Sequence, residues 1–257
     1  MSRASEQFER LMQILVELRG ENGCPWDKEQ TAKSLIPYLL EETYEVIEAI
    51  EENNTEILKE ELGDLLLHII FQAQIAKESS DFEIADSIQN ICDKLVNRHP
   101  HVFSGTVLDS KEKVNQTWET LKWKEKKREN FLDGVPKKLP ALTRARRIQE
   151  KASNVGFDWK HIKPIWDKVD EELNELKIAW EDSSFEEIEE ELGDVIFSLV
   201  NLGRFLNISS EDALRKTISK FENRFKHIES ELKEQGKQLG DATLEEMNQI
   251  WEATKDK

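Results

Sequence analysis

The sequence has few of the residues that build disulfide-rich or β-rich proteins. It contains two cysteines, Cys24 and Cys92, in 257 residues. They are widely spaced and neither belongs to a Cys-x-x-Cys pair, so a disulfide framework is excluded. Ten glycines and six prolines fall mostly at the boundaries of apolar-periodic segments, and alternating β-branched runs are nearly absent. The composition therefore favours an all-helical protein.

A long hydrophobic run is also lacking. The longest one, residues 65–71, is interrupted by His68 and is too short to span a bilayer. The first twenty residues mix charged and apolar side chains and lack the apolar centre of a signal peptide. We therefore expect a cytoplasmic protein.

Positively charged residues are fewer than negatively charged ones. The chain carries 36 Lys and Arg residues against 53 Asp and Glu residues, which gives a net charge of −17. A surface that binds duplex DNA or an anionic membrane should be basic, so neither partner is expected. An acidic protein can still bind phosphates when divalent cations lie between the two.

Apolar residues recur with helical spacing along most of the chain. The pattern predicts helices, with ends placed to within about 2–4 residues, at 3–19, 34–52, 55–77, 81–98, 111–129, 139–153, 161–182, 184–206, 209–235 and 243–255. The segment 131–140 carries Gly134, Pro136 and Pro140 and is the best linker candidate. We expect one domain at 1–130 and a second at 141–257.

An internal repeat supports two related domains. Residues 41–64 read EETYEVIEAIEENNTEILKEELGD, and residues 171–194 read EELNELKIAWEDSSFEEIEEELGD, at a constant offset of 130. Further along, 93–103 resembles 219–229, and 115–119 resembles 248–252. Acids, then bases, then a tryptophan recur in the same order, which indicates tandem duplicated helical-bundle domains.

Four acidic side chains of each copy should converge between two helices. Glu42 and Glu45 lie three residues apart on one helix face, as do Glu61 and Asp64 on the next helix. The short loop between these helices makes them antiparallel neighbours. The second copy repeats the arrangement with Glu172, Glu175, Glu191 and Asp194.

Such a quartet needs a cation, because desolvated like charges raise each other's pKa and destabilise the fold. Hard oxygen ligands without cysteine or histidine suit Mg²⁺, with Mn²⁺ as a possible substitute. The sequence therefore predicts two magnesium sites, each with room for one to three ions.

Two other interpretations of the acids fit the sequence less well. A single Glu-x-x-Glu pair is usually solvated surface, but here the pair recurs on adjacent helices and again in the second copy. A di-iron bundle uses Glu-x-x-His pairs, whereas Glu61 and Glu191 are followed by aspartate. His68, four residues after Asp64, has Ser198 as its counterpart and is better interpreted as a helix-face or core histidine.

Apolar residues border both quartets, and we expect this stripe to face the core. Its members are Val46, Ile47, Ile50, Leu62, Leu65, Leu66 and Ile69, and then Leu173, Leu176, Leu192, Val195, Ile196 and Leu199. Gly63 and Gly193 lie inside helices, where glycine costs about 1 kcal/mol relative to alanine. We expect a close backbone approach at both glycines.

These residues match a known family. EExxE followed by EELGD on two helices resembles the all-α nucleoside triphosphate pyrophosphohydrolase superfamily. Five segments resemble the MazG family in particular: ENGCPWDKEQT (21–31), LEETYEVIEAI (40–50), RHPHVF (98–103), LPALTRARRIQEKASNVGFDW (139–159) and EEELGD (189–194).

The resemblance implies hydrolysis of nucleoside triphosphates, ATP among them, to monophosphate and pyrophosphate by an intimate homodimer of broad specificity. It implies a role in housecleaning of the nucleotide pool. It assigns the metal ligands to the two quartets. It also assigns nucleotide contacts to Lys168, Glu171, Glu172, Glu187, Ile188, Glu189, Glu190, Asp194, Lys220, Arg224 and Trp251.

The chemistry suggests roles for some of these side chains. Glu171 or Glu190 could orient or deprotonate the attacking water. Lys220 and Arg224, one helical turn apart, could meet the β- and γ-phosphates. Trp251 is equally suited to base stacking and to core packing. The repeat places counterparts of the basic pair and the tryptophan at Lys94, Arg98 and Trp118.

The two copies are not equal, because Lys168 has Tyr38 at the corresponding position. The extra cation leads to the hypothesis that the second domain is the stronger catalyst. Two other functions stay open at this point. One is a narrower pyrophosphohydrolase acting on dUTP or phosphoribosyl-ATP, and the other is a non-catalytic helical scaffold with structural metal.

Overall fold

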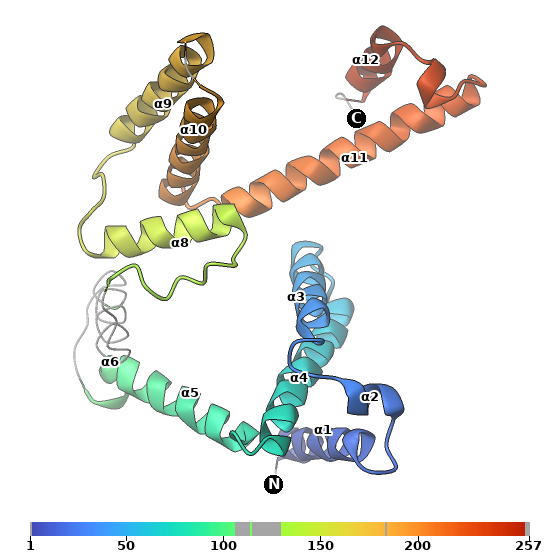
Figure 1. The fold of residues 1–257 in the computed structure, drawn as a ribbon, viewed down its shortest axis with the longest axis vertical. Helices are drawn as coiled ribbons and strands as arrows, with labels where there is room; N and C mark the ends of the chain where they lie inside the picture. The colour runs from blue at the N-terminus through green and yellow to red at the C-terminus, as the bar shows by residue number, and fades with distance from the viewer. Residues whose placement is uncertain (1, 106–113, 115–129, 183, 255–257) are drawn as a thin grey trace. The chain divides into compact units, whose positions relative to one another are not determined.

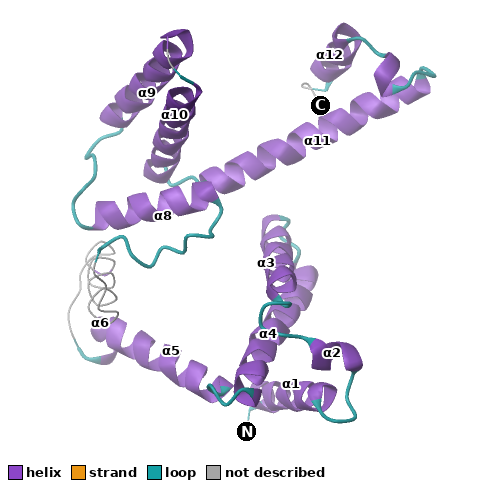
Figure 2. Cartoon of the chain, viewed as in Figure 1, coloured by secondary structure: helices purple, strands orange, loops and turns teal. Residues whose placement is uncertain are grey.

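The computed structural model describes residues 2–105, 114, 130–182 and 184–254, and every regular element in these ranges is a helix (Figure 1, Figure 2). This confirms the predicted all-α class. The chain divides into two compact units, residues 1–107 and 108–257. The predicted helix at 111–129 lies almost wholly outside the described residues. The expected linker at 131–140 and the domain limits stay predictions.

The first unit is built on a helical hairpin. Its helices are α1 (Arg3–Arg19), α2 (Pro25–Glu29), α3 (Ile36–Glu51), α4 (Thr55–Glu78), α5 (Ile84–Arg98) and α6 (Pro100–Phe103). Between α3 and α4, Asn53 adopts a left-handed conformation with φ of 56°. Asn54 then begins α4 by accepting a hydrogen bond from the Ile57 amide at 3.2 Å. This tight turn makes α3 and α4 the antiparallel neighbours that the sequence predicts.

Helix α1 packs across α4 and forms the core of this unit. Leu15, Leu35, Ile70 and Phe71 are buried together. At the edge of this core the Arg19 guanidinium lies 5.2 Å from the centre of the Phe71 ring and 2.6 Å from a carboxylate oxygen of Glu78. The hydrogen bonds from Arg19 lower the pKa of Glu78. The ion pair therefore fixes the end of α1 against α4.

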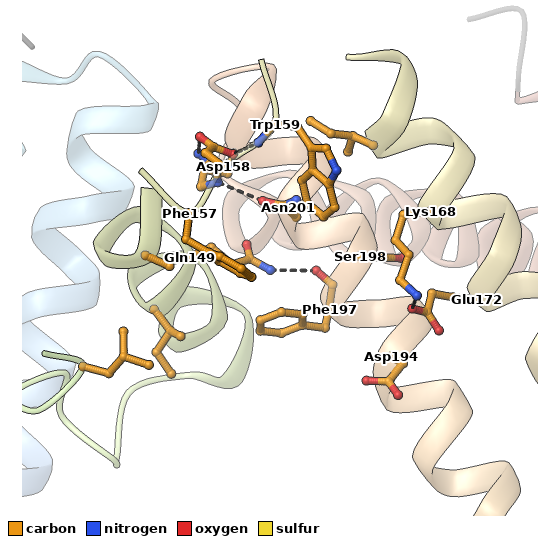
Figure 3. Close-up of a pocket in the computed structure, with 15 residues that line it drawn as sticks. Gln149, Phe157, Asp158, Trp159, Lys168, Glu172, Asp194, Phe197, Ser198 and Asn201 are labelled. Carbon is orange, nitrogen blue, oxygen red and sulfur yellow. Dashed lines mark hydrogen bonds and ion pairs between the residues drawn. The ribbon is translucent and has the colours of Figure 1, made fainter. Parts of the chain in front are cut away.

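The second unit repeats the hairpin. Its helices are α8 (Ala141–Asn154), α9 (Lys163–Asp182), α10 (Phe185–Phe205), α11 (Ser210–Glu234) and α12 (Leu244–Ala253), with a short 3₁₀ helix, η1 (Leu239–Asp241). Ser184 and Glu187 form a capping box at the start of α10, which satisfies its first amides. Ile165, Val169 and Leu202 are buried between α9 and α10. Helix α8 crosses α10 on the opposite side from α9 in Figure 3.

The predicted helices within the described residues are all present, with ends that shift by a few residues. The helices α2, α6 and η1 were not predicted, because elements of three to five residues are too short to show a helical period. Among the helices of the described residues, we find no candidate for a membrane-spanning segment.

Part of the predicted core-facing stripe is exposed, which corrects the sequence expectation. The side chains that lie on the surface of their units include Ile50, Leu62, Ile69, Leu173, Leu192, Ile196 and Leu199. A hairpin of two helices has two apolar sides, and the described chain covers one of them. Val195, on the covered side, is buried as expected.

The expected close backbone approach at Gly63 and Gly193 is also wrong for the described residues. A Cβ atom built at either position meets nothing within 4 Å. Both glycines are exposed and neighbour Leu62 and Leu192, on the side that this chain leaves uncovered. Contacts within the described part of the chain therefore do not account for these glycines.

Candidate functional site

The first acidic cluster lies between the helices of the first hairpin. Glu42 and Glu45 on α3 and Glu61 on α4 each offer a carboxylate oxygen, and the three oxygens lie within 4.8 Å of one another. Asp64, one turn after Glu61, is close enough to raise the pKa of Glu42. The structure thus brings three acids of the first quartet together on the hairpin, with Asp64 nearby.

Burial and mutual repulsion disfavour the charged forms of this cluster. The pKa of Glu42 is raised by burial first, and then by Glu45, Asp64 and Glu61. The pKa of Glu61 is raised by burial and by Glu45. A carboxyl group whose pKa is higher in the folded state favours folding when protonated, and this contribution is lost as the pH rises through that pKa. At neutral pH the metal-free cluster therefore opposes folding, and a cation would relieve it.

The second cluster has the same geometry and a built-in cation. Oxygens of Glu172 and Glu175 on α9 and Glu191 on α10 lie within 4.8 Å of one another. The Lys168 ammonium is 2.7 Å from an oxygen of Glu171 and 2.7 Å from one of the buried Glu172. These contacts, with Glu171 first and then Glu172, raise the pKa of Lys168. Lys168 therefore stays charged beside the acids.

Glu175 shows that one lysine does not neutralise the second cluster. Its pKa is raised by burial first, and then by the hydrogen bond and charge of Glu172 and by the charge of Glu191, with a smaller opposing effect from Lys168. Glu172, Glu175 and Glu191 have Lys168 as their positive neighbour, and one positive charge does not balance three negative ones. Binding of a further cation would therefore be favourable.

In the first unit, neutral rings replace this lysine. Tyr38, the counterpart of Lys168, stacks on His68 with ring centres 6.3 Å apart and planes 7° apart. Trp26 meets the edge of Tyr38 with centres 6.0 Å apart. His68 Nε2 lies 3.8 Å from Glu42 Oε1, but burial lowers the pKa of His68 and favours its neutral form. His68 is buried, in keeping with a core histidine.

A cavity of about 350 Å³ lies next to the second cluster. Helices α8, α9 and α10 and the loop before α9 form its wall, which is largely apolar (Figure 3). Lys168, Glu172 and Asp194 lie on one side of it, and Gln149 and Phe157 lie on the other. An apolar chamber with a few polar groups, opening beside charged ones, has the general character of a small-molecule site.

Sequence reasoning missed most of this cavity. On α10, Asp194, Ser198 and Asn201 follow one another at i, i+4 and i+7, so the face that carries the acids continues into the cavity wall. Phe157 and Trp159 come from the loop before α9. The polar i, i+4, i+7 pattern was readable in the sequence, but the approach of the loop and α8 was not.

The predicted phosphate and base contacts near the C-terminus lie on α11 and α12. The Arg224 guanidinium is 5.4 Å from the centre of the Trp251 ring, and the Phe221 ring centre is 5.1 Å from it. Lys220 is exposed one turn before Arg224. The structure therefore brings Arg224 and Trp251 together, and their contact with a nucleotide stays a prediction.

The remaining candidates lie in several places. Glu187, Ile188, Glu189 and Glu190 occupy the start of α10, where the Glu187 carboxylate accepts a hydrogen bond from the Ser184 amide at 3.1 Å. Glu189 and Glu190 are exposed and Ile188 is half-buried. Lys94 and Arg98 lie on α5, where Arg98 is buried. Trp118 lies outside the described residues.

The donor set of both clusters fits a hard divalent cation. Every group is a carboxylate, and the oxygens of three acids in each cluster already converge. Burial first, and then the neighbouring carboxylates, raise the pKa values of Glu42, Glu61 and Glu175. Glu42, Glu45, Glu61 and Asp64, and Glu172, Glu175, Glu191 and Asp194, are the residues that would hold it. The identity of the ion stays a prediction.

Comparison with known proteins gives a consistent result. The MazG nucleotide pyrophosphohydrolase domain matches residues 30–103 and 163–229. The chain is 47% identical over 257 residues to the nucleoside triphosphate pyrophosphohydrolase/pyrophosphatase MazG of Thermotoga maritima, covering 99% of this chain and 98% of that protein. It is 43% identical to the nucleoside triphosphate pyrophosphohydrolase of Escherichia coli K12, covering 97% of each. A protein called YabN from Bacillus subtilis is 44% identical over 97% of this chain and 52% of its own length.

Proposed function

We propose that this chain, which belongs to the MazG nucleotide pyrophosphohydrolase family, catalyses the Mg²⁺-dependent attack of water on the α-phosphorus of a nucleoside triphosphate. The products are a nucleoside monophosphate and pyrophosphate. Ribo- and deoxyribonucleotides with different bases are accepted, and the physiological task is housecleaning of the nucleotide pool.

One observation carries the proposal. In the second unit, Glu172, Glu175 and Glu191 converge beside Lys168, and Lys168, Glu172 and Asp194 border an apolar cavity. A nucleoside triphosphate has the complementary division into a charged tail and a flat, largely apolar base. The acids and Lys168 suit the phosphates, and the cavity suits the base.

The side chains of the site have separate roles in this proposal. Mg²⁺ bound by the acids would neutralise phosphate charge and act as a Lewis acid. Glu171, held 2.7 Å from Lys168, or the exposed Glu190 orients the attacking water and accepts its proton. Lys168 faces the phosphates as a permanent cation. Lys220 and Arg224 stabilise the charge that develops on the leaving pyrophosphate.

The reaction is tested by the identity of its products and by the position of an ¹⁸O label that comes from the water. We expect ATP, GTP, CTP, UTP and their deoxy forms to yield monophosphate and pyrophosphate in Mg²⁺ buffer, because the apolar cavity wall imposes little base selection. In H₂¹⁸O the label should appear in the monophosphate, as attack at the α-phosphorus requires, and mass spectrometry would locate it.

Other outcomes separate the competing functions. Label in pyrophosphate, or release of inorganic phosphate with a diphosphate, would rule out attack at the α-phosphorus. Turnover of dUTP or phosphoribosyl-ATP alone would replace broad specificity with a narrow one. No turnover of any triphosphate would leave only the scaffold interpretation.

A homodimer is part of the proposal, and exposed apolar stripes on the second unit support it. On α10, Leu192, Ile196 and Leu199 are each more than 40% exposed, and α11 carries Leu214, Ile218 and Phe221 at similar spacing and exposure. Each set follows i, i+4, i+7, so it forms one face of its helix. Apolar faces of this extent usually mark an interface.

Light scattering should give twice the chain mass of 30.0 kDa. The double substitution Leu214→Glu with Ile218→Glu should shift the mass to that of a monomer, because it places charges on the apolar face of α11. Lys216→Glu, on a different face of the same helix, is the matched control and should stay dimeric. A wild-type protein that runs as a monomer at micromolar concentration would contradict the proposal.

A further inference from the structure

Gln149 is a buried polar residue in the wall of the cavity. It comes from α8, and its side chain is 8% exposed. Its amide nitrogen donates a hydrogen bond to the Phe197 carbonyl of α10 at 2.9 Å (Figure 3). Within the described part of the chain its amide oxygen is buried and has no hydrogen-bond partner.

The contact with Phe197 fixes which end of the amide is free. The two ends of a glutamine amide are assigned from their partners, and a backbone carbonyl can only accept. The nitrogen must therefore face Phe197, which leaves Oε1 as the end without a partner. A buried acceptor of this kind is costly unless a donor on a ligand or a water molecule satisfies it.

Neighbouring polar groups of the cavity are engaged inside the protein. The Ser198 hydroxyl donates to the Val195 carbonyl at 2.8 Å. The Asn201 amide oxygen accepts from Arg204 Nε at 2.9 Å, and Arg204 also pairs with Asp158. Gln149 Oε1 differs from these groups because it is buried, can only accept, and has no partner among the residues that the structure describes.

We propose that Gln149 recognises the nucleobase in this cavity, because its Oε1 accepts a hydrogen bond from an N–H on the edge of the base. This proposal rests on the proposed function. The N–H could be the exocyclic amino group of adenine or cytosine, or the ring N–H of uracil or guanine. A site that hydrogen-bonds a substrate N–H disfavours an analogue without it, because the protein group is then left unpaired.

Matched substrates test the proposal directly. The amino arm compares ATP with purine riboside triphosphate and CTP with 2-pyrimidinone riboside triphosphate. The ring N–H arm compares UTP with N3-methyluridine triphosphate. For the wild-type protein, kcat/KM should fall roughly 10- to 100-fold when the N–H is removed in at least one arm. The arm that responds identifies the N–H.

Gln149→Met removes the hydrogen-bonding groups at similar volume. In this variant the kcat/KM ratio within the responding pair should fall to about one. Gln72→Met is the control, because Gln72 also donates to a backbone carbonyl, that of Ala32 at 3.1 Å, but lies in the first unit. The control should keep the wild-type ratio.

Two results would overturn the proposal. One is a wild-type protein that hydrolyses triphosphates but distinguishes no pair, which needs no variant and so stands even if Gln149→Met folds poorly. The other is a folded Gln149→Met protein that keeps the wild-type ratio in the responding pair. Both results leave the proposed hydrolysis intact.

Discussion

Glu172→Gln should lower the rate of pyrophosphate release at least about 100-fold, because partners one shell outside a metal ligand already contribute 10- to 100-fold. Glu172 is buried, lies within 4.8 Å of Glu175 and Glu191, and borders the cavity. Glutamine keeps the size of the side chain and removes its charge. The loss should therefore fall on kcat, with little change in folding.

The same substitution at Glu42, its counterpart in the first unit, should leave most of the activity. Glu42 lies beside His68, whose neutral form is favoured, and Tyr38 stacks on that ring. In the second unit, Lys168 instead places a full positive charge where the phosphates would lie. The hypothesis that the second domain is the stronger catalyst therefore gains a structural reason.

Pyrophosphate release by the two single variants and the double variant decides the ranking. We expect Glu42→Gln to release pyrophosphate at nearly the wild-type rate. Glu172→Gln should be nearly as slow as the double variant. Circular dichroism and thermal melting should confirm that each variant is folded. Equal losses in the two single variants would show that both units catalyse, and a larger loss at Glu42 would reverse the ranking.

The arrangement of the acidic clusters was accessible from the sequence because it depends on short-range rules. Spacing of three residues places Glu42 with Glu45, and the tight turn at Asn53 brings Glu61 to them. The offset of 130 then carried the same prediction to the second unit. Each step depends on contacts between adjacent helices, for which helical periodicity is sufficient.

The cavity and the surface stripes depend on information that periodicity does not carry. Gln149 reaches Phe197 across 48 residues of sequence, through the packing of α8 on α10. Periodicity identifies Ile196 as apolar but does not say whether its own chain covers it, and the structure shows it 43% exposed. The fold class was therefore predictable, whereas the full wall of the site was not.

Removal of Mg²⁺ should abolish turnover and also lower the melting temperature. Excess EDTA should reduce pyrophosphate release by at least about 1,000-fold, because a metal ion contributes several kcal/mol to stabilising the charge of the transition state and each 1.36 kcal/mol is a factor of ten. Helical content should persist at 25 °C, because the cores around Leu15 and Ile165 contain no acidic residue of the clusters.

The change in stability follows from the electrostatics of the metal-free clusters. Their raised carboxyl pKa values reflect burial and mutual repulsion, and an ion that binds only the folded state relieves the repulsion. Mg²⁺ at one hundred times its dissociation constant should add about 2.7 kcal/mol per site to the free energy of unfolding. Differential scanning calorimetry with and without Mg²⁺ would measure the shift in melting temperature.

Variants of single acids and replacement of the metal test whether the effect of Mg²⁺ on activity and stability comes from the acidic clusters. Glu175→Gln should remove the Mg²⁺ titration of the second unit and leave that of the first, whereas Glu229→Gln, on the exposed surface of α11, should change neither. Mn²⁺ should restore activity after EDTA. A di-iron centre would instead require iron and give a visible spectrum, and a structural metal would raise the melting temperature without any turnover. Full activity in excess EDTA would contradict the metal assignment, because it would leave the converging acids without the positive charge on which the mechanism depends.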